Sequence, residues 1–262
     1  MDPRLAGRNK VDGSSANETY FKNWPLAECP YVKDVNWACS IGIQYLQKIA
    51  PLYKPGGKFH GIVALVIFDF DDCVLPTSYL SEKEYMTING MIGENVISTN
   101  DISNLDDISI LSTHLFKECS KYGDVVIITN SQQGWVRKST LKFLPSFFPV
   151  LESVNVLSAH AMSSHLSDDP GVWKNDTFSK YTFHNQYDHV ISVGDSQHER
   201  QAVFNLPTGL RKSVKFIEKP TIFQLMSQLQ CLIQNLSYVV KHTTDCDSYI
   251  HFSPFGIYLM YD

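Results

Sequence analysis

The chain has 262 residues and a formal net charge of −5 at pH 7. This charge argues against a general nucleic-acid-binding protein, which normally carries an excess of basic residues. The six cysteines lie far apart without a C-x-x-C pair, which is more typical of buried reduced thiols than of a disulfide framework. We find neither an apolar signal core near the start nor an apolar run long enough to span a membrane. We therefore expect a cytoplasmic protein that binds neither nucleic acid in general nor membranes.

The first 58 residues divide into two segments by composition. Residues 1–19 are polar, which predicts a flexible tail. Residues 20–58 are rich in aromatic side chains, and apolar residues at helical spacing from Val35 to Ile49 predict a helix that ends before Pro51. We expect this N-terminal extension to pack on the main domain or to contact a protein partner.

An apolar run over residues 62–68 ends abruptly in three carboxylates, Asp69, Asp71 and Asp72. Its branched and aromatic residues predict a strand that is buried on both faces, as in parallel sheets. Carboxylates are costly to desolvate at the end of such a strand unless positive charge lies nearby. Because ligands bind outside the carboxyl ends of parallel strands, this position predicts a cation site, a nucleophile or both. We expect Asp72 to be a turn residue.

The remaining chain alternates between apolar strands and amphipathic helices. Residues 76–105 are polar and weakly patterned, and helical spacing of apolar residues then predicts a helix over 106–122. Further strands are predicted at 124–130, 154–159, 189–195 and 213–218, and further helices at 135–144, 172–183, 196–204 and 222–236. The last of these helices begins with a capping box formed by Thr221 and Gln224.

This alternation predicts an α/β fold with a Rossmann-like, doubly wound, mainly parallel sheet and helices on both faces. The domain is expected to occupy residues 59–244. The segment 245–262 is again rich in aromatic residues, and we expect a C-terminal extension that packs on the domain or docks to a protein partner.

Polar residues follow several of the predicted strands, and such strand ends gather at one edge of a parallel sheet. Thr129 and Asn130 end the second strand, Asp195 ends the fourth, and Lys174 lies near the start of the helix between them. A carboxylate cluster suits Mg²⁺, which prefers oxygen ligands and retains water molecules that a phosphate can replace. A hydroxyl and a lysine suit phosphate oxygens, and an aspartate can attack phosphorus. Together these residues predict a phosphoryl-transfer site.

Four segments in this order resemble the haloacid dehalogenase-like (HAD) hydrolase superfamily, in its small-cap or capless phosphatase type. The matching segments are FDFDDCVL (68–75), VVIITN (125–130), Lys174 in VWKNDTF and SVGDSQHE (192–199). The resemblance implies a magnesium-dependent phosphatase that hydrolyses phosphomonoesters through an aspartyl-phosphate intermediate.

The resemblance also implies roles for individual residues. Asp69 matches the nucleophile, and Asp71 matches the general acid/base. Thr129, with the adjacent Asn130, and Lys174 match the phosphate-binding positions. The implied magnesium ligands are Asp69, Asp71, Asp195 and Glu199.

Three assignments remain open at the level of sequence. Glu199 either binds metal or caps a helix with Ser196, because S-x-x-E is also a capping box, and both roles are compatible. Lys180 is an alternative to Lys174 as the phosphate lysine. Cys73 departs from the family pattern, which usually has Thr or Val there; without a neighbouring histidine in the sequence, we expect a packed thiol.

Neither residues 76–105 nor residues 131–173 leave room for a full cap domain, so we expect little or no cap. Because small-cap relatives act on bulky or macromolecular phosphates, the resemblance implies a substrate of that kind. An alternative is a catalytically weak or inactive HAD-like protein that binds or assembles with a partner through its aromatic extensions. A response-regulator receiver is excluded, because its phosphorylated aspartate lies on a middle strand, whereas here the acidic pair follows the first.

Overall fold

The computed structural model describes residues 63–86, 93, 95–183, 187–207, 209–254 and 256–261. The tail predicted at 1–19 and the extension predicted at 20–58 lie outside the described residues.

Seven strands form a single sheet. They are β1 (Ala64–Phe68), β2 (Gly123–Thr129), β3 (Asn155–Ser158), β4 (His189–Gly194), β5 (Leu210–Lys215), β6 (Cys246–Ser253) and β7 (Gly256–Tyr261). Their order across the sheet is β3-β2-β1-β4-β5-β6-β7. Neighbours from β3 to β6 pair in parallel, and β7 alone runs antiparallel to β6. The predicted α/β fold with a mostly parallel sheet is confirmed.

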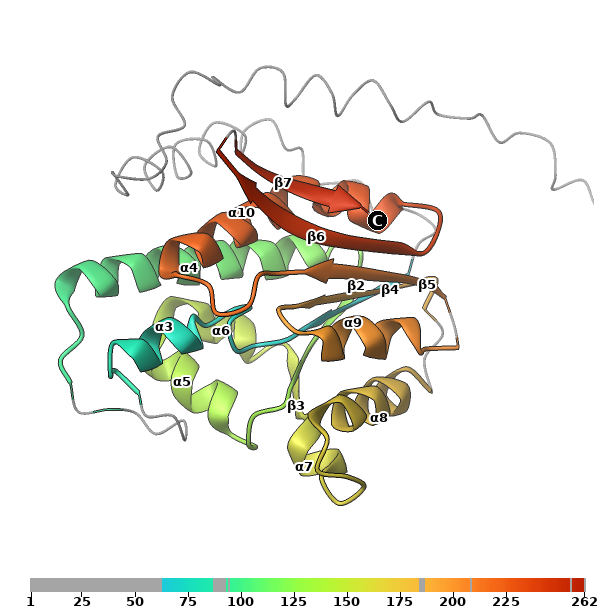
Figure 1. Ribbon diagram of the computed structural model, residues 1–262, viewed down its shortest axis with the longest axis horizontal. Coiled ribbons are helices and arrows are strands. Elements are labelled where there is room, and N and C mark those ends of the chain that lie inside the picture. The colour runs from blue at the N-terminus through green and yellow to red at the C-terminus, as the bar shows by residue number, and fades with distance from the viewer. Residues whose placement is uncertain are drawn as a thin grey trace, which may run out of the picture.

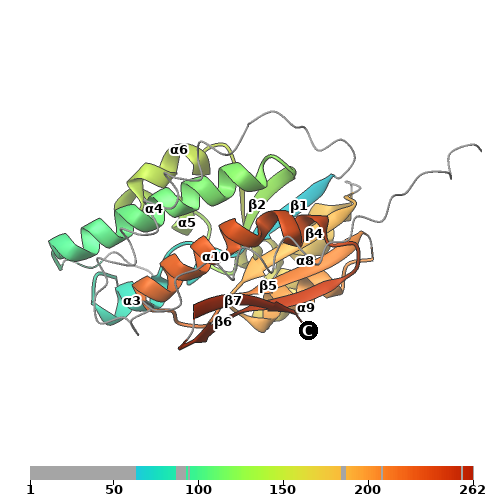
Figure 2. The same ribbon diagram turned by 90° about the horizontal axis from the view of Figure 1, so that it is seen from above.

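Helices pack on both faces of the sheet, as Figures 1 and 2 show. They are α3 (Thr77–Glu82), α4 (Thr99–Cys119), α5 (Trp135–Phe143), the 3₁₀ turn η4 (Pro145–Phe147), α6 (Phe148–Leu151), α7 (Ala159–Ser163), α8 (Pro170–Phe183), α9 (Gln197–Phe204) and α10 (Ile222–Lys241). The described residues contain no separate cap domain. None of the helices within the described ranges is long and apolar enough to cross a membrane.

The side chains of β1 alternate between two cores. Val66 and Phe68 belong to the core under α4 and α10, whereas Leu65 and Ile67 belong to the core under α8 and α9. All four are fully buried. This explains why the strand is apolar without interruption, since a central parallel strand faces helices on both sides.

The C-terminal part of the sheet differs most from the sequence prediction. The fifth strand was predicted at 213–218 and lies at 210–215, because two basic residues, Arg211 and Lys212, concealed its start. Residues 246–261 form the β6–β7 hairpin, for which the sequence predicted no strands. The predicted capping box at Thr221 is confirmed.

The connection from β5 to β6 also has an unusual hand. From β4 to β5 to β6 the chain moves in one direction across the sheet, yet α9 and α10 lie on opposite faces. The two crossovers therefore have opposite hands. The other parallel crossovers share the hand of β4–α9–β5, so the β5–α10–β6 crossover is the exception to a rule that nearly all parallel sheets obey.

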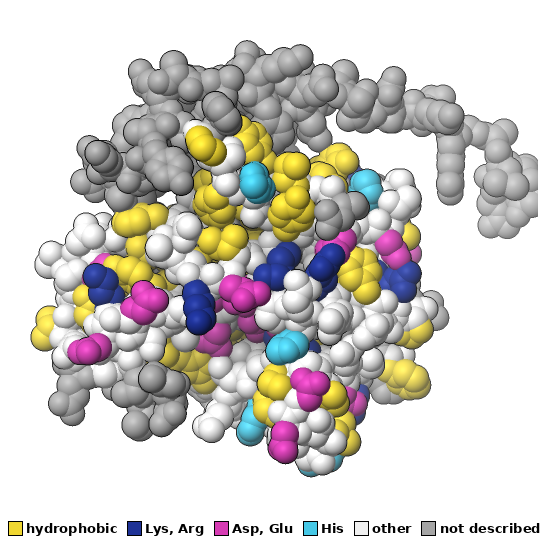
Figure 3. Space-filling view, viewed as in Figure 1, with side chains coloured by type: hydrophobic (Ala, Val, Ile, Leu, Met, Phe, Trp, Pro, Cys, Tyr) yellow, Lys and Arg dark blue, Asp and Glu magenta, His cyan; other side chains and the backbone are white. Residues whose placement is uncertain are grey.

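The face in Figure 3 carries acidic and basic side chains side by side across its middle, below a group of hydrophobic side chains. Charges of both signs are thus interspersed on this face rather than gathered into a field of one sign.

Candidate active site

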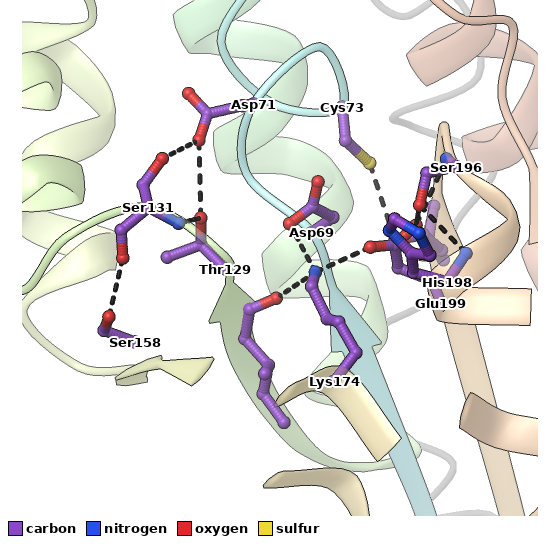
Figure 4. A network of polar contacts seen from close by, with 12 residues as sticks. Asp69, Asp71, Cys73, Thr129, Ser131, Ser158, Lys174, Ser196, His198 and Glu199 are labelled. Atoms are coloured by element: carbon purple, nitrogen blue, oxygen red, sulfur yellow. Dashed lines mark hydrogen bonds and ion pairs between the residues drawn. The ribbon is translucent and has the colours of Figure 1, made fainter. Parts of the chain in front are cut away.

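A buried lysine joins two carboxylates at the carboxyl edge of the sheet. Asp69 follows β1, and its backbone N–H donates to the carbonyl of Val193 in β4 at 2.9 Å. Lys174, on α8, is fully buried and places its Nζ 2.6 Å from Asp69 Oδ1 and 2.7 Å from Glu199 Oε1. The same ammonium donates to the carbonyl of Ile128 in β2 at 2.6 Å. Figure 4 shows this bridge, which draws on β1, β2, α8 and α9.

Lys174, rather than Lys180, lies beside Asp69. The side chain of Lys180 is 48% exposed and pairs with Asp176 at 2.7 Å.

The bridge shifts the proton affinities of its members in opposite directions. Burial opposes the charge of Lys174, but the adjacent Asp69 and Glu199 outweigh it and raise the pKa of Lys174 above its ordinary value. Burial would also raise the pKa of Glu199, but Lys174 lowers that pKa to about 2. Burial raises the pKa of Asp69 to about 7, against the attraction of Lys174.

Asp195, which follows β4, adds a further acid to this cluster. Its burial, together with the charges of Asp69 and Glu199, raises the pKa of Asp195 to about 8. Three acids thus lie within electrostatic reach of one another, with Lys174 as the cation that bridges two of them. One ammonium thus faces three acids, and a bound cation would supply further positive charge.

The donor set fits Mg²⁺ better than a metal that needs a preformed cage. Among the described residues, no three His, Cys, Asp or Glu side chains are grouped to hold a metal ion by themselves. Mg²⁺ requires only one or two carboxylates, because water and substrate oxygens complete its shell. Asp69 and Asp195 are the acids that suit this role.

Glu199 also takes part in the cap of α9, together with Ser196. Its Oε2 accepts from the backbone N–H of Ser196 at 3.1 Å, and the Ser196 hydroxyl accepts from the N–H of His198 at 3.0 Å. These bonds form the capping box at the start of α9, which confirms the capping alternative. A Cβ on Gly194 would lie 2.6 Å from the Cγ of Glu199, so only glycine lets Glu199 pack against the end of β4.

Asp71 faces away from this bridge, toward β2 and α5, as Figure 4 shows. Its two carboxylate oxygens accept hydrogen bonds from Thr77 Oγ1 (2.6 Å), Ser131 Oγ (2.6 Å), Trp135 Nε1 (2.9 Å) and Thr129 Oγ1 (3.3 Å). All of these donors are neutral. Two distinct polar clusters therefore meet at the end of β1. The charged cluster contains Asp69 and Lys174, and the neutral cluster consists of the uncharged donors around Asp71.

Asp72 and Cys73 complete the turn after β1. Asp72 has a positive φ of 54° and accepts from the backbone N–H of Ser78 at 2.8 Å, as expected of a turn residue. Cys73 is fully buried, and burial raises the pKa of its thiol well above the ordinary value. Its Sγ lies 3.6 Å from the carbonyl oxygen of Val193, which fits a packed thiol.

The structure distributes the phosphate-binding candidates between the two clusters. Lys174 belongs to the charged cluster, whereas Thr129 is buried beside Asp71 and accepts from the N–H of Ser131 at 3.0 Å. The side-chain oxygen of Asn130 is buried and has no hydrogen-bond partner in the described part of the chain.

Sequence reasoning missed three residues of the neutral cluster, namely Thr77, Ser131 and Trp135. Ser131 directly follows the second matching segment, which is a weak signal. Thr77 and Trp135 carried none, because they reach Asp71 only through the turns after β1 and β2.

Comparisons of the chain with protein-family models, with curated proteins and with solved structures found no match.

Proposed function

We propose that the protein is a Mg²⁺-dependent phosphatase that hydrolyses phosphomonoesters through an aspartyl-phosphate on Asp69. The observation that carries this proposal is the buried bridge of Asp69, Lys174 and Glu199 at the carboxyl edge of the sheet. A carboxylate at this edge is placed where ligands of open α/β sheets bind. The adjacent ammonium offsets negative charge on both the nucleophile and the phosphate.

In the first step, a carboxylate oxygen of Asp69 attacks phosphorus and the bond from phosphorus to the ester oxygen breaks. The electron pair of that bond goes to the leaving oxygen. Asp71, in its acid form, gives this oxygen a proton, so that the leaving group departs as an alcohol. Asp71 is thereby left as a carboxylate.

In the second step, the Asp71 carboxylate takes a proton from a water molecule whose oxygen attacks phosphorus. The bond between phosphorus and Asp69 breaks, its electron pair returns to the Asp69 carboxylate, and inorganic phosphate leaves. Asp71 is again an acid, so the cycle closes. The donors around Asp71 hold this carboxyl group in place through both steps.

Thr129 and Asn130 are the proposed contacts to the phosphate oxygens opposite Lys174. The Thr129 hydroxyl makes a long hydrogen bond of 3.3 Å to Asp71, whereas Ser131 makes one of 2.6 Å. A phosphate oxygen can replace Asp71 as the acceptor for Thr129 at little cost, because the long bond is weak.

Asp69 and Asp195 would hold Mg²⁺, which supplies positive charge against the two carboxylates and the phosphate. The raised pKa of Asp195, caused by burial and by the neighbouring acids, supports a cation at this position.

The test is hydrolysis of p-nitrophenyl phosphate with and without Mg²⁺, with Asp69→Asn as the paired variant. We expect magnesium-dependent turnover that the substitution abolishes. The substitution keeps the size of the side chain and one acceptor for Lys174, so the fold should be retained. Turnover that ignores Mg²⁺ or persists in Asp69→Asn contradicts the proposal.

The alternative is a protein that binds a partner on the same scaffold without turnover. Both oxygens of Asp71 already accept hydrogen bonds from the protein. This favours the alternative, since a general acid needs an oxygen that can contact the substrate. Calorimetry separates the two functions: Mg²⁺ binding without hydrolysis of any phosphate in a broad panel would support the alternative.

A further inference from the structure

Two clefts of similar size open beside the carboxyl edge of the sheet. The first has a volume of about 300 Å³ and lies between β3 and the start of α5, with Thr129, Gln132, Gln133, Val136, Val154 and Val156 among its walls. The second has a volume of about 290 Å³ and lies by β5 and β6, with Gln197, Arg200, Lys215, Ile217, Asp247 and Tyr249 among its walls. Their volumes therefore do not show which of the two clefts binds the leaving group of a substrate.

The orientation of Asp71 favours the first cleft. A general acid must touch the leaving oxygen, so the leaving group departs on the side that the acid faces. Asp71 faces Thr129, Ser131 and Trp135, which belong to β2 and the segment leading into α5. Thr129 itself lines the first cleft, and Ser158, another lining residue, donates to the carbonyl of Ser131 at 2.6 Å.

The second cleft lies on the opposite side of Asp69. Its Lys215 donates to the backbone carbonyl of Asp195, and its Arg200 pairs with Asp247. These contacts connect it to the acid that we assign to metal binding rather than to the general acid. The second cleft therefore serves as a matched control for the first.

The lining of the first cleft indicates what it accepts. Its walls include the apolar side chains of Val136, Leu151, Val154 and Val156. Its charged side chains, Arg137 and Glu152, form an ion pair with each other. The remaining side chains are neutral, either aliphatic or polar (Thr129, Gln132, Gln133 and Ser158). Because the ion pair is already neutralised and the aliphatic side chains offer an apolar surface, the cleft suits an apolar body better than a second anionic group.

We propose that the cleft between α5 and β3 binds the leaving group of the substrate, and that this group is an alcohol with an apolar body. This inference rests on the proposed phosphatase function and adds the class of ester that the site prefers. The phosphoryl group lies at Asp69, the ester oxygen meets Asp71, and the carbon chain extends past Thr129 toward Val156.

The test compares hydrolysis of ethyl phosphate and hexyl phosphate by the full chain with Mg²⁺. Ethanol and hexanol are leaving groups of nearly equal acidity, so chemistry alone gives the two esters similar rates. Partial burial of the four additional methylene groups should raise kcat/KM for hexyl phosphate about 10- to 100-fold. The ratio of the two kcat/KM values is the readout.

Matched variants assign this ratio to one of the two clefts. Val156→Asp places a carboxylate in the first cleft at a side chain that is 39% exposed on an edge strand, where charge is tolerated. It should bring the hexyl-to-ethyl ratio close to one. Ile217→Asp places the same group in the second cleft and should leave the ratio as in the wild type. Circular dichroism and a thermal melt check that both variants are folded.

Three outcomes would overturn the inference. If the wild type hydrolyses both esters in an Asp69-dependent way with a ratio near one, the cleft does not bind the leaving group, but the phosphatase function is retained. A ratio lost in Ile217→Asp and kept in Val156→Asp moves the leaving group to the second cleft. No hydrolysis of any phosphomonoester removes the proposed function and this inference together.

Discussion

Two lysines in the described part of the chain are fully buried, and their pKa values shift in opposite directions. Lys174 contacts two carboxylates, and its pKa is raised above the ordinary value. Lys212, on β5, donates to the carbonyls of Val239 (2.8 Å) and Val240 (2.7 Å) at the end of α10. Its Nζ also lies 2.8 Å from Nδ1 of His189, and burial lowers the pKa of Lys212 to about 8.

Burial is common to both lysines, so the partners make the difference. The carbonyls at the end of a helix attract a cation only through partial charges, and this attraction is weaker than the cost of desolvating the ammonium. The attraction of two carboxylates exceeds that cost and keeps the ammonium charged. A buried lysine is therefore not by itself a sign of function. The carboxylates around Lys174, at the edge where ligands bind, are what mark it.

Removing the ammonium at Lys174 should have the largest effect of any single change. Lys174→Met leaves Asp69 and Glu199 buried without their shared cation. We expect the free energy of unfolding to fall by about 3–5 kcal/mol, as when one partner of a buried ion pair is removed. Loss of charge stabilisation at the phosphate should lower kcat about 100- to 1000-fold. Urea unfolding and steady-state kinetics measure the two effects.

Lys180→Met is the matched control, since Lys180 lies on the same helix and pairs with Asp176 at the surface. Its effect on unfolding should stay within about 1 kcal/mol. Equal urea midpoints for the Lys174→Met variant and the wild type would show that the buried bridge contributes nothing to stability.

Lys212→Met should have a smaller effect that depends on pH. The pKa of Lys212 is about 8 in the folded chain, below its value of about 10.4 in the unfolded chain. Between these values the unfolded chain binds more protons, so the stability of the wild type rises with pH from about 8 to about 10. The variant lacks this rise. At pH 10 it should be less stable by about 1–3 kcal/mol, because two buried carbonyls lose their donor.

Urea unfolding between pH 7 and pH 10 measures this difference. If the free energy of unfolding of Lys212→Met rises with pH as steeply as that of the wild type, a group other than Lys212 is responsible for the rise.

The same two lysines show what the sequence could and could not predict. Lys174 was predicted, with Lys180 as the alternative, from the family resemblance together with the apolar runs that locate the neighbouring strands, whose ends lie at one edge of the sheet. The burial of Lys212 was not predicted, since a lysine in a strand is usually exposed to solvent. Its burial arises only when α10 crosses the face opposite to α9, with the uncommon hand.

The neutral cluster at Asp71 gives a similar lesson. The acid was predicted from the strand end, but its donors Ser131 and Trp135 were not, because side-chain contacts across turns leave no periodic pattern. The β6–β7 hairpin escaped prediction because its aromatic residues resembled an extension rather than strands.

Mg²⁺ should raise the free energy of unfolding by binding to the acids around Lys174, and it should have no effect at Lys212, which has no carboxylate among its hydrogen-bond partners in the described residues. The pKa values of Asp69 and Asp195 are raised, to about 7 and about 8, chiefly by burial. Above their unfolded values of about 4, the folded chain binds more protons, so stability without metal falls as the pH rises toward 8. Mg²⁺ binds the ionised carboxylates, and its effect should therefore be larger at pH 8 than at pH 6.

At a fixed Mg²⁺ concentration that is ten times Kd at pH 8, the expected gain at pH 8 is about 1.4 kcal/mol, and the gain at pH 6 is smaller because Kd is higher there. Thermal melts with and without Mg²⁺ at the two pH values measure it. Asp195→Asn should remove most of the gain. An equal gain in this variant would place the ion elsewhere.

At the carboxyl edge of the sheet, Asp71 differs from Asp69 in that all of its hydrogen-bond donors are neutral. Removing one of these donors should have the smallest effect of the changes considered. Trp135→Phe removes the indole N–H that lies 2.9 Å from Asp71 and keeps an aromatic ring. We expect kcat/KM for ethyl phosphate to fall about three- to tenfold, the effect of one hydrogen bond. The kcat/KM for dinitrophenyl phosphate should be unaffected, because its leaving group departs without a proton and kcat/KM does not include the later attack of water. Trp173→Phe, whose indole donates to the carbonyl of Ser167, is the control. Equal losses on both substrates would mean that Trp135 supports the fold and does not position the acid.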